Sequence, residues 1–518
     1  MDGSNKAKRV VILGGGTAGW MAANLMIQAW GKYGFDITLI EAPDIGIIGV
    51  GEGSTPALKS FMDTIGLDEK DWMPACNATY KLGIRFDGWS TKPGFPRYFH
   101  PFPAQTDEFT APAFFQNSLA RRNGLDIEGH PDHFFLNTYM AEHLRSPFAG
   151  ENFPFSVHYG YHFDSGLLGQ YLGKVAEQRG VKHVLAKVTS TQVGADGRIE
   201  SVTADNGQSY KADYFVDCSG FRSTLMQQAL RVPFVPYTEQ LFNDAAVVFP
   251  TPRPAEVAPQ TISTALRNGW AWTIPLTSRI GNGYVYSSAY TTAAEAEQEL
   301  RAFTGVGESA DVEVRHLSMK VGRTAEQWAG NCIAVGLSQG FIEPLEATAL
   351  LLVQFTVQSF IWSLETANFT DAKRDQFNHA VNSRFDAVRD YVMTHYLVNS
   401  RTDTDYWRAN ADNSKVSSSL YDIISTWTAG KDLTAELRRQ KLEDYYPSTS
   451  WHCLLAGYGV YPAREGLHAR DTELHQAKLN EIREFIRRCA LNYAPHMEVL
   501  AAGAMSTRNQ AAANFRQT

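Results

Sequence analysis

Residues 9–41 read RVVILGGGTAGWMAANLMIQAWGKYGFDITLIE and predict a strand, a helix and a second strand in succession. The apolar run at 10–13 is typical of a buried parallel strand. A glycine-rich turn follows at 14–19, and residues 20–30 have helical periodicity. A second apolar run at 37–40 ends at Glu41. This succession predicts an α/β fold built on a parallel sheet.

The glycine turn, GGGTAG, matches the G-x-G-x-x-G pattern of dinucleotide-binding turns. Gly14 allows a tight turn, Gly16 lets the backbone approach a pyrophosphate, and Gly19 lets helix and strand pack closely. The helix start offers free N–H groups to phosphate. Glu41 can accept hydrogen bonds from a ribose. The predicted contacts in the turn are Gly14, Gly16, Thr17, Ala18 and Gly19. The alternative is a glycine-rich turn in some other α/β protein.

Composition places the chain among globular proteins. It has 518 residues, which suggests two or three structural units, with 44% hydrophobic and 20% charged residues. The net charge of −8 comes without a basic block, so we expect no nucleic-acid partner. Residues 1–9 contain no apolar signal segment. The most apolar long window, 342–362, contains Glu343 and Glu346 near its start and predicts a buried helix, not a membrane span.

Five scattered cysteines, none in C-x-x-C spacing, indicate a reduced cytoplasmic location and no metal site. Farther along, residues 42–56 predict a glycine-rich loop, and residues 90–160 predict irregular segments and short helices that cover a pocket. A meander over 188–217 returns the chain to the parallel sheet, ending in DCSG. This order of elements resembles FAD-binding oxidoreductases.

The predicted fold class is therefore mixed α/β: a three-layer ββα Rossmann-like FAD-binding fold, an antiparallel sheet and a mostly helical C-terminal region. We expect residues 1–345 to form the FAD-binding unit, including the segments at about 90–160 and the antiparallel sheet at about 242–315. Residues 346–518 should form a helical, substrate-side region that packs on the first and does not fold independently. The last 25 or so residues look loosely held.

Three further motifs carry a more specific resemblance. They are WAWTIP at 270–275, GVGEGSTP at 49–56 with Lys81 downstream in NATYKLG, and GFIEPLEAT at 340–348. With these motifs the chain resembles the flavin-dependent halogenases of the tryptophan-halogenase type, over nearly all of residues 8–465. The first motif fits that family's W-x-W-x-I-P pattern, whose markers here are Trp270, Trp272 and Pro275.

The resemblance implies a two-component chemistry. A separate NAD(P)H-dependent reductase supplies FADH2, which reacts with O2. Bound chloride or bromide is then oxidised to hypohalous acid, which travels through the protein to a small aromatic substrate kept apart from the flavin. Further FAD contacts implied by position are Gly51, Ser54, Thr55, Val188 and Leu337.

Two residues are the catalytic candidates. Lys81 would direct hypohalous acid through its ammonium or amine group. Glu346 would stabilise the cationic ring and take its proton. The plainer readings are a solvated surface lysine and a helix N-terminal glutamate favoured by the helix dipole. Glu343 is expected to be structural.

Halide is expected at backbone N–H groups near Thr348 and Ala349, where a helix follows a proline-containing turn. The family commonly has glycine where Ala349 stands and serine where Ala347 stands; at Ala349 the amide donor is kept, but the halide pocket is more crowded. Trp270 and Trp272 face one side of a strand and would wall the flavin from substrate, or simply pack the core.

The substrate region departs from the family. Halogenases of free tryptophan carry a longer stretch after a Tyr-Tyr pair, which folds over the amino acid. Here Tyr446 is followed at once by PSTSWHC, so a zwitterion would lose its polar partners. We therefore predict that indole or an indole derivative is preferred over free tryptophan. His100, Phe102 and Trp451 are the expected aromatic walls, with ordinary core packing as the alternative.

Three rival functions remain open at this stage. An FAD-dependent aromatic monooxygenase shares the fold, and a flavin-binding protein without turnover would need neither Lys81 nor Glu346. An enzyme that uses NAD(P)H directly is disfavoured because no second G-x-G-x-x-G unit is present. The oligomeric state is also open, a homodimer being one option.

Overall fold

The first strand of the chain lies inside a six-stranded sheet of order β21-β22-β13-β1-β2-β9. The computed structural model describes residues 8–43, 51–307, 310–468 and 472–503. All neighbouring strands run parallel except the β21–β22 pair. The strands are β1 (Arg9–Leu13), β2 (Asp36–Glu41), β9 (Lys182–Leu185), β13 (Tyr214–Asp217), β21 (Trp328–Ala329) and β22 (Cys332–Ala334).

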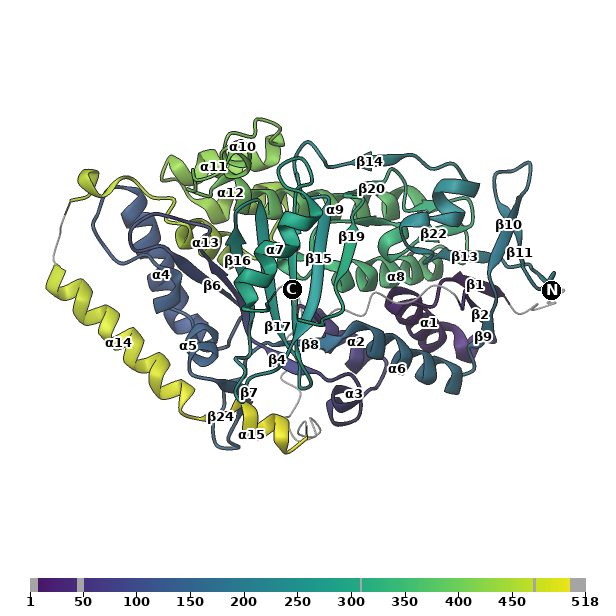
Figure 1. Cartoon of the computed structure of the whole chain (residues 1–518), viewed down its shortest axis with the longest axis horizontal. Helices are drawn as coiled ribbons and strands as arrows, with labels where there is room; N and C mark the ends of the chain where they lie inside the picture. The colour runs from purple at the N-terminus through teal and green to yellow at the C-terminus, as the bar shows by residue number, and fades with distance from the viewer. Residues whose placement is uncertain (1–7, 44–50, 308–309, 469–471, 504–518) are drawn as a thin grey trace.

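Helices and a small meander cover this sheet, which confirms the predicted Rossmann-like α/β class. Helix α1 packs against both α6 and α8. The predicted meander forms an antiparallel three-stranded sheet of order β10-β11-β12. Figure 1 shows it beside β1 and β13 near the N-terminal end of the chain. The bounds are α1 (Thr17–Trp30), α6 (Ser165–Gln178), α8 (Ala349–Thr366), β10 (Val188–Val193), β11 (Ile199–Ala204) and β12 (Ser209–Tyr210).

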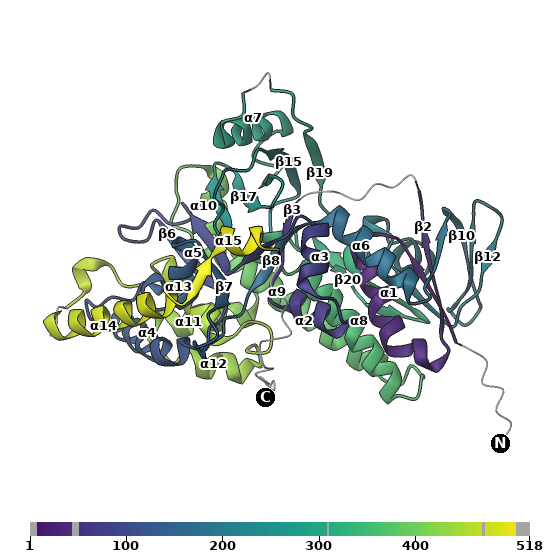
Figure 2. The same ribbon diagram turned by 90° about the horizontal axis from the view of Figure 1, so that it is seen from below.

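A second large sheet has seven strands in the order β19-β15-β18-β17-β16-β5-β6. The strands from β15 to β19 pair antiparallel, as expected, but β5 joins β16 in parallel. The expected all-strand segment also contains a helix, α7 (Ala293–Thr304), which Figure 2 shows over this sheet. The strands are β5 (Gly83–Asp87), β6 (Arg97–Pro101), β15 (Ala245–Thr251), β16 (Thr261–Leu266), β17 (Gly269–Pro275), β18 (Ile280–Tyr286) and β19 (Arg315–Ser318).

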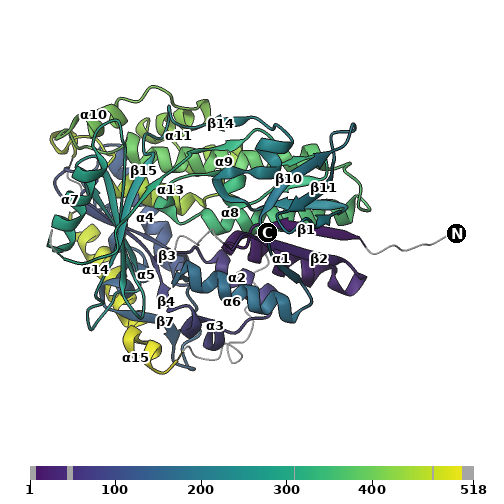
Figure 3. The same cartoon turned by 45° about the vertical axis from the view of Figure 1, so that its right-hand side comes forward.

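A three-stranded sheet of order β3-β8-β4 lies between the two large sheets (Figure 3). Strand β8 was not predicted; it begins at Gly160, where the segment expected to be irregular ends. Successive side chains of β4 point to opposite faces. On the face away from Lys81, Tyr80, Tyr159 and Tyr161 donate hydrogen bonds to buried Glu69, at 3.1, 2.7 and 2.6 Å. The bounds are β3 (Gly51–Gly53), β4 (Thr79–Lys81) and β8 (Gly160–Asp164).

The C-terminal part is mostly helical, as expected, but its end is better packed than expected. Strand β24 (Tyr493–Pro495) pairs with β7 (Arg145–Ala149), and His496 and Val499 are buried. The prediction of a loose terminus was therefore wrong as far as residue 501. The helices are α9 (Arg374–Leu397), α10 (Asp405–Ala411), α11 (Ser418–Thr428), α12 (Leu433–Gln440), α13 (Ser448–Gly457), α14 (Thr472–Ala490) and α15 (His496–Ala501).

The segment at 90–160 holds a longer helix than predicted, α4 (Asp107–Arg122), whose sixteen residues lie beside α14 at one end of the molecule (Figure 2). One apolar cluster extends from Val10 in β1 to Val499 in α15, so the core continues across the predicted domain boundary. The remaining α-helices and β-strands are α2 (Ala57–Thr64), α3 (Glu69–Ala75), α5 (Leu136–Glu142), β14 (Phe234–Pro236), β20 (Gly322–Thr324) and β23 (Gly340–Phe341).

Within the described ranges, no helix combines the length and apolar character that a membrane span requires. The same residues contain no cluster of three or more histidine, cysteine, aspartate or glutamate side chains suited to a metal ion. All five cysteines are free thiols.

Candidate active site

The glycine turn between β1 and α1 has the geometry that a pyrophosphate requires. Gly14 has a φ of +118°, and a Cβ there would lie 2.2 Å from the carbonyl oxygen of Cys218. A Cβ on Gly19 would lie 1.9 Å from the Gly14 carbonyl oxygen, so helix and turn are in direct contact. Nothing lies within 4 Å of a Cβ on Gly16, which leaves open space at the helix start.

Helix α1 begins without competition for an anion. Its N-cap residue, Gly16, offers no side chain, and the first turn contains no acidic residue. Thr17 donates its hydroxyl to the Ser165 carbonyl at 3.1 Å. Glu41, at the end of β2, lies across Gly15 and is 2.9 Å from Nε2 of His183. Backbone N–H groups, open space and a nearby carboxylate fit the phosphates and ribose of FAD.

The other predicted FAD contacts are arranged around this turn in different ways. A Cβ on Gly336 would lie 2.7 Å from that of Ala18, so Leu337 follows a residue in contact with the start of α1. Val188 begins β10 and joins a separate apolar cluster with Ile40. The predicted loop falls partly outside the described residues, because residues 44–50, including Gly49 and Val50, are not described.

Strand β3, followed by Ser54 and Thr55, comes directly after that loop. A Cβ on Gly51 would lie 3.4 Å from the side chain of Ile274 and 3.5 Å from that of Leu276, and β3 contacts the WAWTIP strand β17. Ser54 is buried and exchanges two hydrogen bonds with the backbone of Tyr161, at 2.8 and 3.0 Å. Thr55 accepts from the backbone N–H of Ala57 at 3.4 Å.

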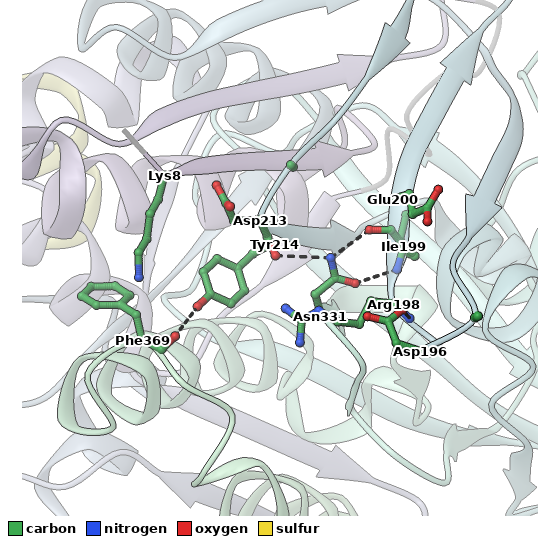
Figure 4. A pocket seen from close by; sticks show the side chains of 11 residues that line it. Lys8, Asp196, Arg198, Ile199, Glu200, Asp213, Tyr214, Asn331 and Phe369 are labelled. Carbon is green, nitrogen blue, oxygen red and sulfur yellow. Dashed lines mark hydrogen bonds between the residues drawn. The ribbon is translucent and has the colours of Figure 1, made fainter. Parts of the chain in front are cut away.

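A surface pocket of about 660 Å³ lies at the other end of the parallel strands. Figure 4 shows Lys8, Asp213 and Tyr214, which stand at the amino ends of β1 and β13, and Asn331, which bridges to β11. Ligands of open parallel sheets bind at the carboxyl ends of the strands. This pocket is therefore not the cofactor site.

Lys81, on β4, is fully buried, which rules out a solvated surface position. Its Nζ has no hydrogen-bond partner among the described residues. It lies 5.5 Å from the centre of the Phe102 ring. Burial lowers the pKa of Lys81 to about 7, against the opposing effect of the Glu346 charge. The side chain is thus near the midpoint between ammonium and amine at neutral pH.

Glu346 lies in a 3₁₀ turn, Pro344–Glu346, just before α8, and not inside the helix as the sequence pattern suggested. It is held between two imidazoles: His100 Nδ1 is 3.1 Å from Oε2, and His395 Nε2 is 2.8 Å from Oε1. Burial raises its pKa, but the charge and hydrogen bond of His100 and the hydrogen bond of His395 lower it to about 2. Glu346 is therefore an anion.

Glu343, three residues earlier, has neutral neighbours. Its Oε2 accepts hydrogen bonds from Asn243 (2.8 Å), Trp270 (2.8 Å) and Tyr396 (2.6 Å). Burial raises its pKa despite these donors. Trp272 packs across Gly283, and its ring centre is 6.0 Å from that of Trp270. Both indoles lie on one side of β17, as the alternation predicted.

The predicted halide position lies at the N-terminus of α8. Thr348 is the N-cap residue and is buried, its side chain makes no capping hydrogen bond, and the first turn contains no acidic residue. Ala347 adopts a left-handed φ of 56°, which turns the chain sharply before Ala349 begins the helix. The geometry suits an anion, since the first N–H groups of a helix lack intrahelical acceptors.

The three residues expected to wall the substrate, His100, Phe102 and Trp451, lie at different distances from Lys81 and Glu346. His100 lies 2.9 Å through Nε2 from Ser450 Oγ, so both its ring nitrogens are occupied. Phe102 follows β6, and its ring lies beside Lys81. Trp451 is buried in α13 and packs edge-on against Tyr391, with ring centres 4.8 Å apart. Phe102 therefore stands beside Lys81 and His100 beside Glu346, whereas Trp451 packs on the far side, against Tyr391.

Four polar residues near these side chains were not identified from sequence. They are His162, Thr261, His395 and Ser450, which contact one another or the predicted residues through hydrogen bonds of 2.8–3.0 Å. His395 occurs in a helical segment, MTHYL, that carries no recognisable chemistry. No spacing in the sequence connects these residues with Lys81 or Glu346, so the fold alone brings them together.

Known proteins of one family are similar to this chain over nearly its whole length. The tryptophan halogenase family matches residues 9–472. The chain is 37% identical to the 7-chloro-L-tryptophan 6-halogenase KtzR of Kutzneria sp. (strain 744), over 95% of this chain and 99% of that protein. Among solved structures, BrvH, a flavin-dependent halogenase from Brevundimonas sp. BAL3, superposes with a TM-score of 0.82 at 32% identity, covering 96% of this chain and 99% of BrvH. MibH, a lanthipeptide tryptophan 5-halogenase, gives 0.82 at 28% identity, covering 97% and 94%.

Proposed function

This chain belongs to the tryptophan halogenase family and is a flavin-dependent halogenase, and from that premise we propose that it halogenates indole or an indole-bearing compound in preference to free tryptophan. As in its family, reduced FAD comes from a separate flavin reductase. The single observation that supports the proposed chemistry is the buried pair formed by unpartnered Lys81 and anionic Glu346.

When bound, reduced FAD supplies the two electrons that activate O2 for oxidation of chloride or bromide. The protein's part begins with the halide, which the N–H groups near Thr348 and Ala349 would hold close to the flavin. Trp270, fixed by Glu343, and Trp272 would separate the flavin from the aromatic substrate. Hypohalous acid is small enough to pass where the substrate is not.

Lys81 and Glu346 would act on that oxidant and on the ring. An ammonium at Lys81 can donate a hydrogen bond to the oxygen of hypohalous acid and draw electron density from the halogen. The Glu346 anion stabilises the cationic ring that forms when the halogen adds. With a pKa of about 2, Glu346 serves better as an electrostatic stabiliser than as the final proton acceptor.

The preference for a substrate without amino-acid groups rests on the turn before α13. The rings of Tyr446 and Tyr391 are stacked, with their centres 3.7 Å apart. Only Pro447 separates Tyr446 from Ser448, the first residue of α13. This path leaves no segment between Tyr446 and the helix that could fold over a zwitterion. A site lacking such partners cannot repay the desolvation of an ammonium and a carboxylate.

The experiment is a mass-spectrometric assay of purified protein with FAD, a reductase, NADH, O2 and either bromide or chloride. Indole and free tryptophan are compared at equal concentration, and we expect halogenated indole to predominate. Predominance of halogenated tryptophan would contradict the substrate proposal and leave the enzyme class intact. A hydroxylated product whose yield is independent of halide would contradict the proposed chemistry.

A further inference from the structure

A row of buried polar side chains lies next to Lys81 and has no part in the mechanism above. In the β3-β8-β4 sheet, His162 stands opposite Gly53 on one side and Thr79 on the other. Lys81 is two residues after Thr79, so its side chain emerges on the same face. Thr261 comes from β16 of the large sheet. The side chains of Thr79, Lys81 and His162 are wholly buried.

These side chains form a hydrogen-bond chain that starts at the WAWTIP motif. Thr79 Oγ1 donates to the carbonyl oxygen of Pro275 at 2.7 Å. Thr79 Oγ1 is also 3.0 Å from His162 Nδ1, and His162 Nε2 is 3.0 Å from Thr261 Oγ1. The family's marker proline is thereby connected, through two threonines and a histidine, to the surroundings of the catalytic lysine.

The direction of every hydrogen bond in this chain is fixed by the Pro275 carbonyl together with a neutral His162 ring. A carbonyl oxygen only accepts, so Thr79 uses its one proton on Pro275 and must accept from His162 Nδ1–H. Burial, with the charges of Lys81 and His496, lowers the pKa of His162 well below its usual value, so the ring is neutral and Nε2 carries a lone pair. Thr261 must therefore donate to His162.

The far end of the chain is consequently an acceptor. Because the Thr261 hydroxyl donates its single proton to His162, it can only accept hydrogen bonds from other partners, through the lone pairs of Oγ1. A Cβ placed on Gly53 would lie 3.2 Å from Thr261 Oγ1 and 3.1 Å from Lys81 Nζ, so both atoms border the same point. Lys81 Nζ, by contrast, has protons to donate and no partner in the described residues.

From this juxtaposition we propose that Thr261 is a second binding residue for hypohalous acid, accepting its O–H while Lys81 donates to its oxygen. The molecule has one donor and one acceptor function, which the Thr261–Lys81 pair complements. Both hydrogen bonds involve the oxygen, so the halogen is left free to face the substrate. Thr79 and His162 are positioning residues that keep Thr261 an acceptor. The inference rests on the proposed function of Lys81.

Gly53 is part of the same arrangement. Any side chain at this position would occupy the space between Thr261 and Lys81, which are both about 3 Å from its Cβ position. Gly160, opposite Lys81 on β8, is also without a side chain. Lys81 and His162 are the titratable groups of this arrangement. The charge of Glu346 acts on Lys81, and the charges of Lys81 and His496 act on His162.

The first test separates binding of the oxidant from its formation. In T261V, which keeps the shape and removes the acceptor, halogenated product per reduced flavin should fall about tenfold, the effect of one lost polar hydrogen bond. Hypohalous acid captured by an added β-diketone trap should rise correspondingly. T261S should restore the ratio, because it keeps the hydroxyl. Unchanged coupling in T261V, or no recovery in T261S when both variants keep the wild-type circular dichroism spectrum, would overturn the proposal.

The second test does not depend on halogenation. With ¹⁵N-histidine labelling and H162Q to assign the signal, His162 should show the Nδ1–H tautomer and remain neutral at pH 7. T79V should remove the constraint and change the two ¹⁵N shifts. An Nε2–H tautomer or a charged ring in the wild type would overturn the fixed direction of the chain. If no substrate is halogenated but the tautomer is as expected, the proposed function fails and the hydrogen-bond chain stands.

Discussion

A buried glutamate lies at each end of the turn at residues 343–346, and the pKa values of the two carboxyl groups shift in opposite directions. Around Glu343 the partners are an amide, an indole and a phenol, which donate hydrogen bonds without carrying charge, and burial raises the pKa. Around Glu346 they are two imidazoles, and the pKa falls to about 2. Burial is equal at the two sites, so partners able to carry positive charge decide ionisation.

The difference separates two tasks within one short segment. Glu343 accepts a hydrogen bond from Trp270, the residue that we propose separates the flavin from the substrate. Glu346 places a negative charge near Lys81, where the aromatic ring would become cationic. Variants on each side of the turn should therefore affect different parts of the reaction.

The largest effect is expected from removing the amino group of Lys81, which lies within the field of the Glu346 charge. K81M should lower halogenation by about 10³-fold, because the hypohalous acid loses the group that activates it. Oxidation of reduced flavin should continue. Product is measured by mass spectrometry relative to NADH consumed, with K59M as a matched control at the partly exposed Lys59. Product formation in K81M equal to that of K59M would remove Lys81 from the mechanism.

A smaller loss, about 10²-fold, is expected for E346Q, because an amide keeps the shape and removes the charge that stabilises the cationic ring. Single-turnover product formation under excess reduced flavin measures the step directly. Circular dichroism checks that the contacts with His100 and His395 still support the fold. An E346Q enzyme with wild-type turnover would show that the charge difference between the two glutamates has no catalytic meaning.

The difference in stability between the wild type and K81M should depend on pH in a defined direction. The pKa of Lys81 is about 7 in the folded protein and 10.5 in the unfolded reference, so the unfolded chain binds more protons between these values. Wild-type stability relative to K81M should therefore rise with pH across that range. The advantage of K81M, at most about 5 kcal/mol below pH 7, should vanish above pH 10.5. Thermal melts at pH 6 and 9 measure it, and a difference independent of pH would contradict the lowered pKa.

The smallest effect is expected at Glu343. E343Q resembles the protonated acid and still offers an oxygen to Trp270, so halogenation should fall less than about tenfold. The E343A variant removes the acceptor and should cost more, through displacement of the Trp270 ring. Near-ultraviolet circular dichroism reports that displacement. If E343Q were as inactive as E346Q, the two sides of the turn would share one task.

Sequence predicted the parts of this molecule that are local. The turn around Gly14 and the helix that begins at Thr17 follow from residues adjacent in the chain, and the family motifs placed Lys81 and Glu346. His395 and Thr261 were missed because they approach those residues only through helix α9 and a parallel β5–β16 pairing. A helix within the predicted antiparallel segment was also missed, since Ala293–Thr304 is capped by Thr292 through a local motif that alternation does not detect.

The face of β4 opposite Lys81 affects how long a halogenase can resist damage by the hypohalous acid that it generates. Tyrosine rings are readily halogenated, yet Tyr80, the residue next to Lys81, points away and donates its hydroxyl to Glu69 together with Tyr159 and Tyr161. The backbone of one strand would thus stand between hypohalous acid bound at Lys81 and the nearest phenols along the chain. Turnovers completed before self-inactivation, with mass spectrometry of the Tyr80 peptide, give a direct measure of that protection.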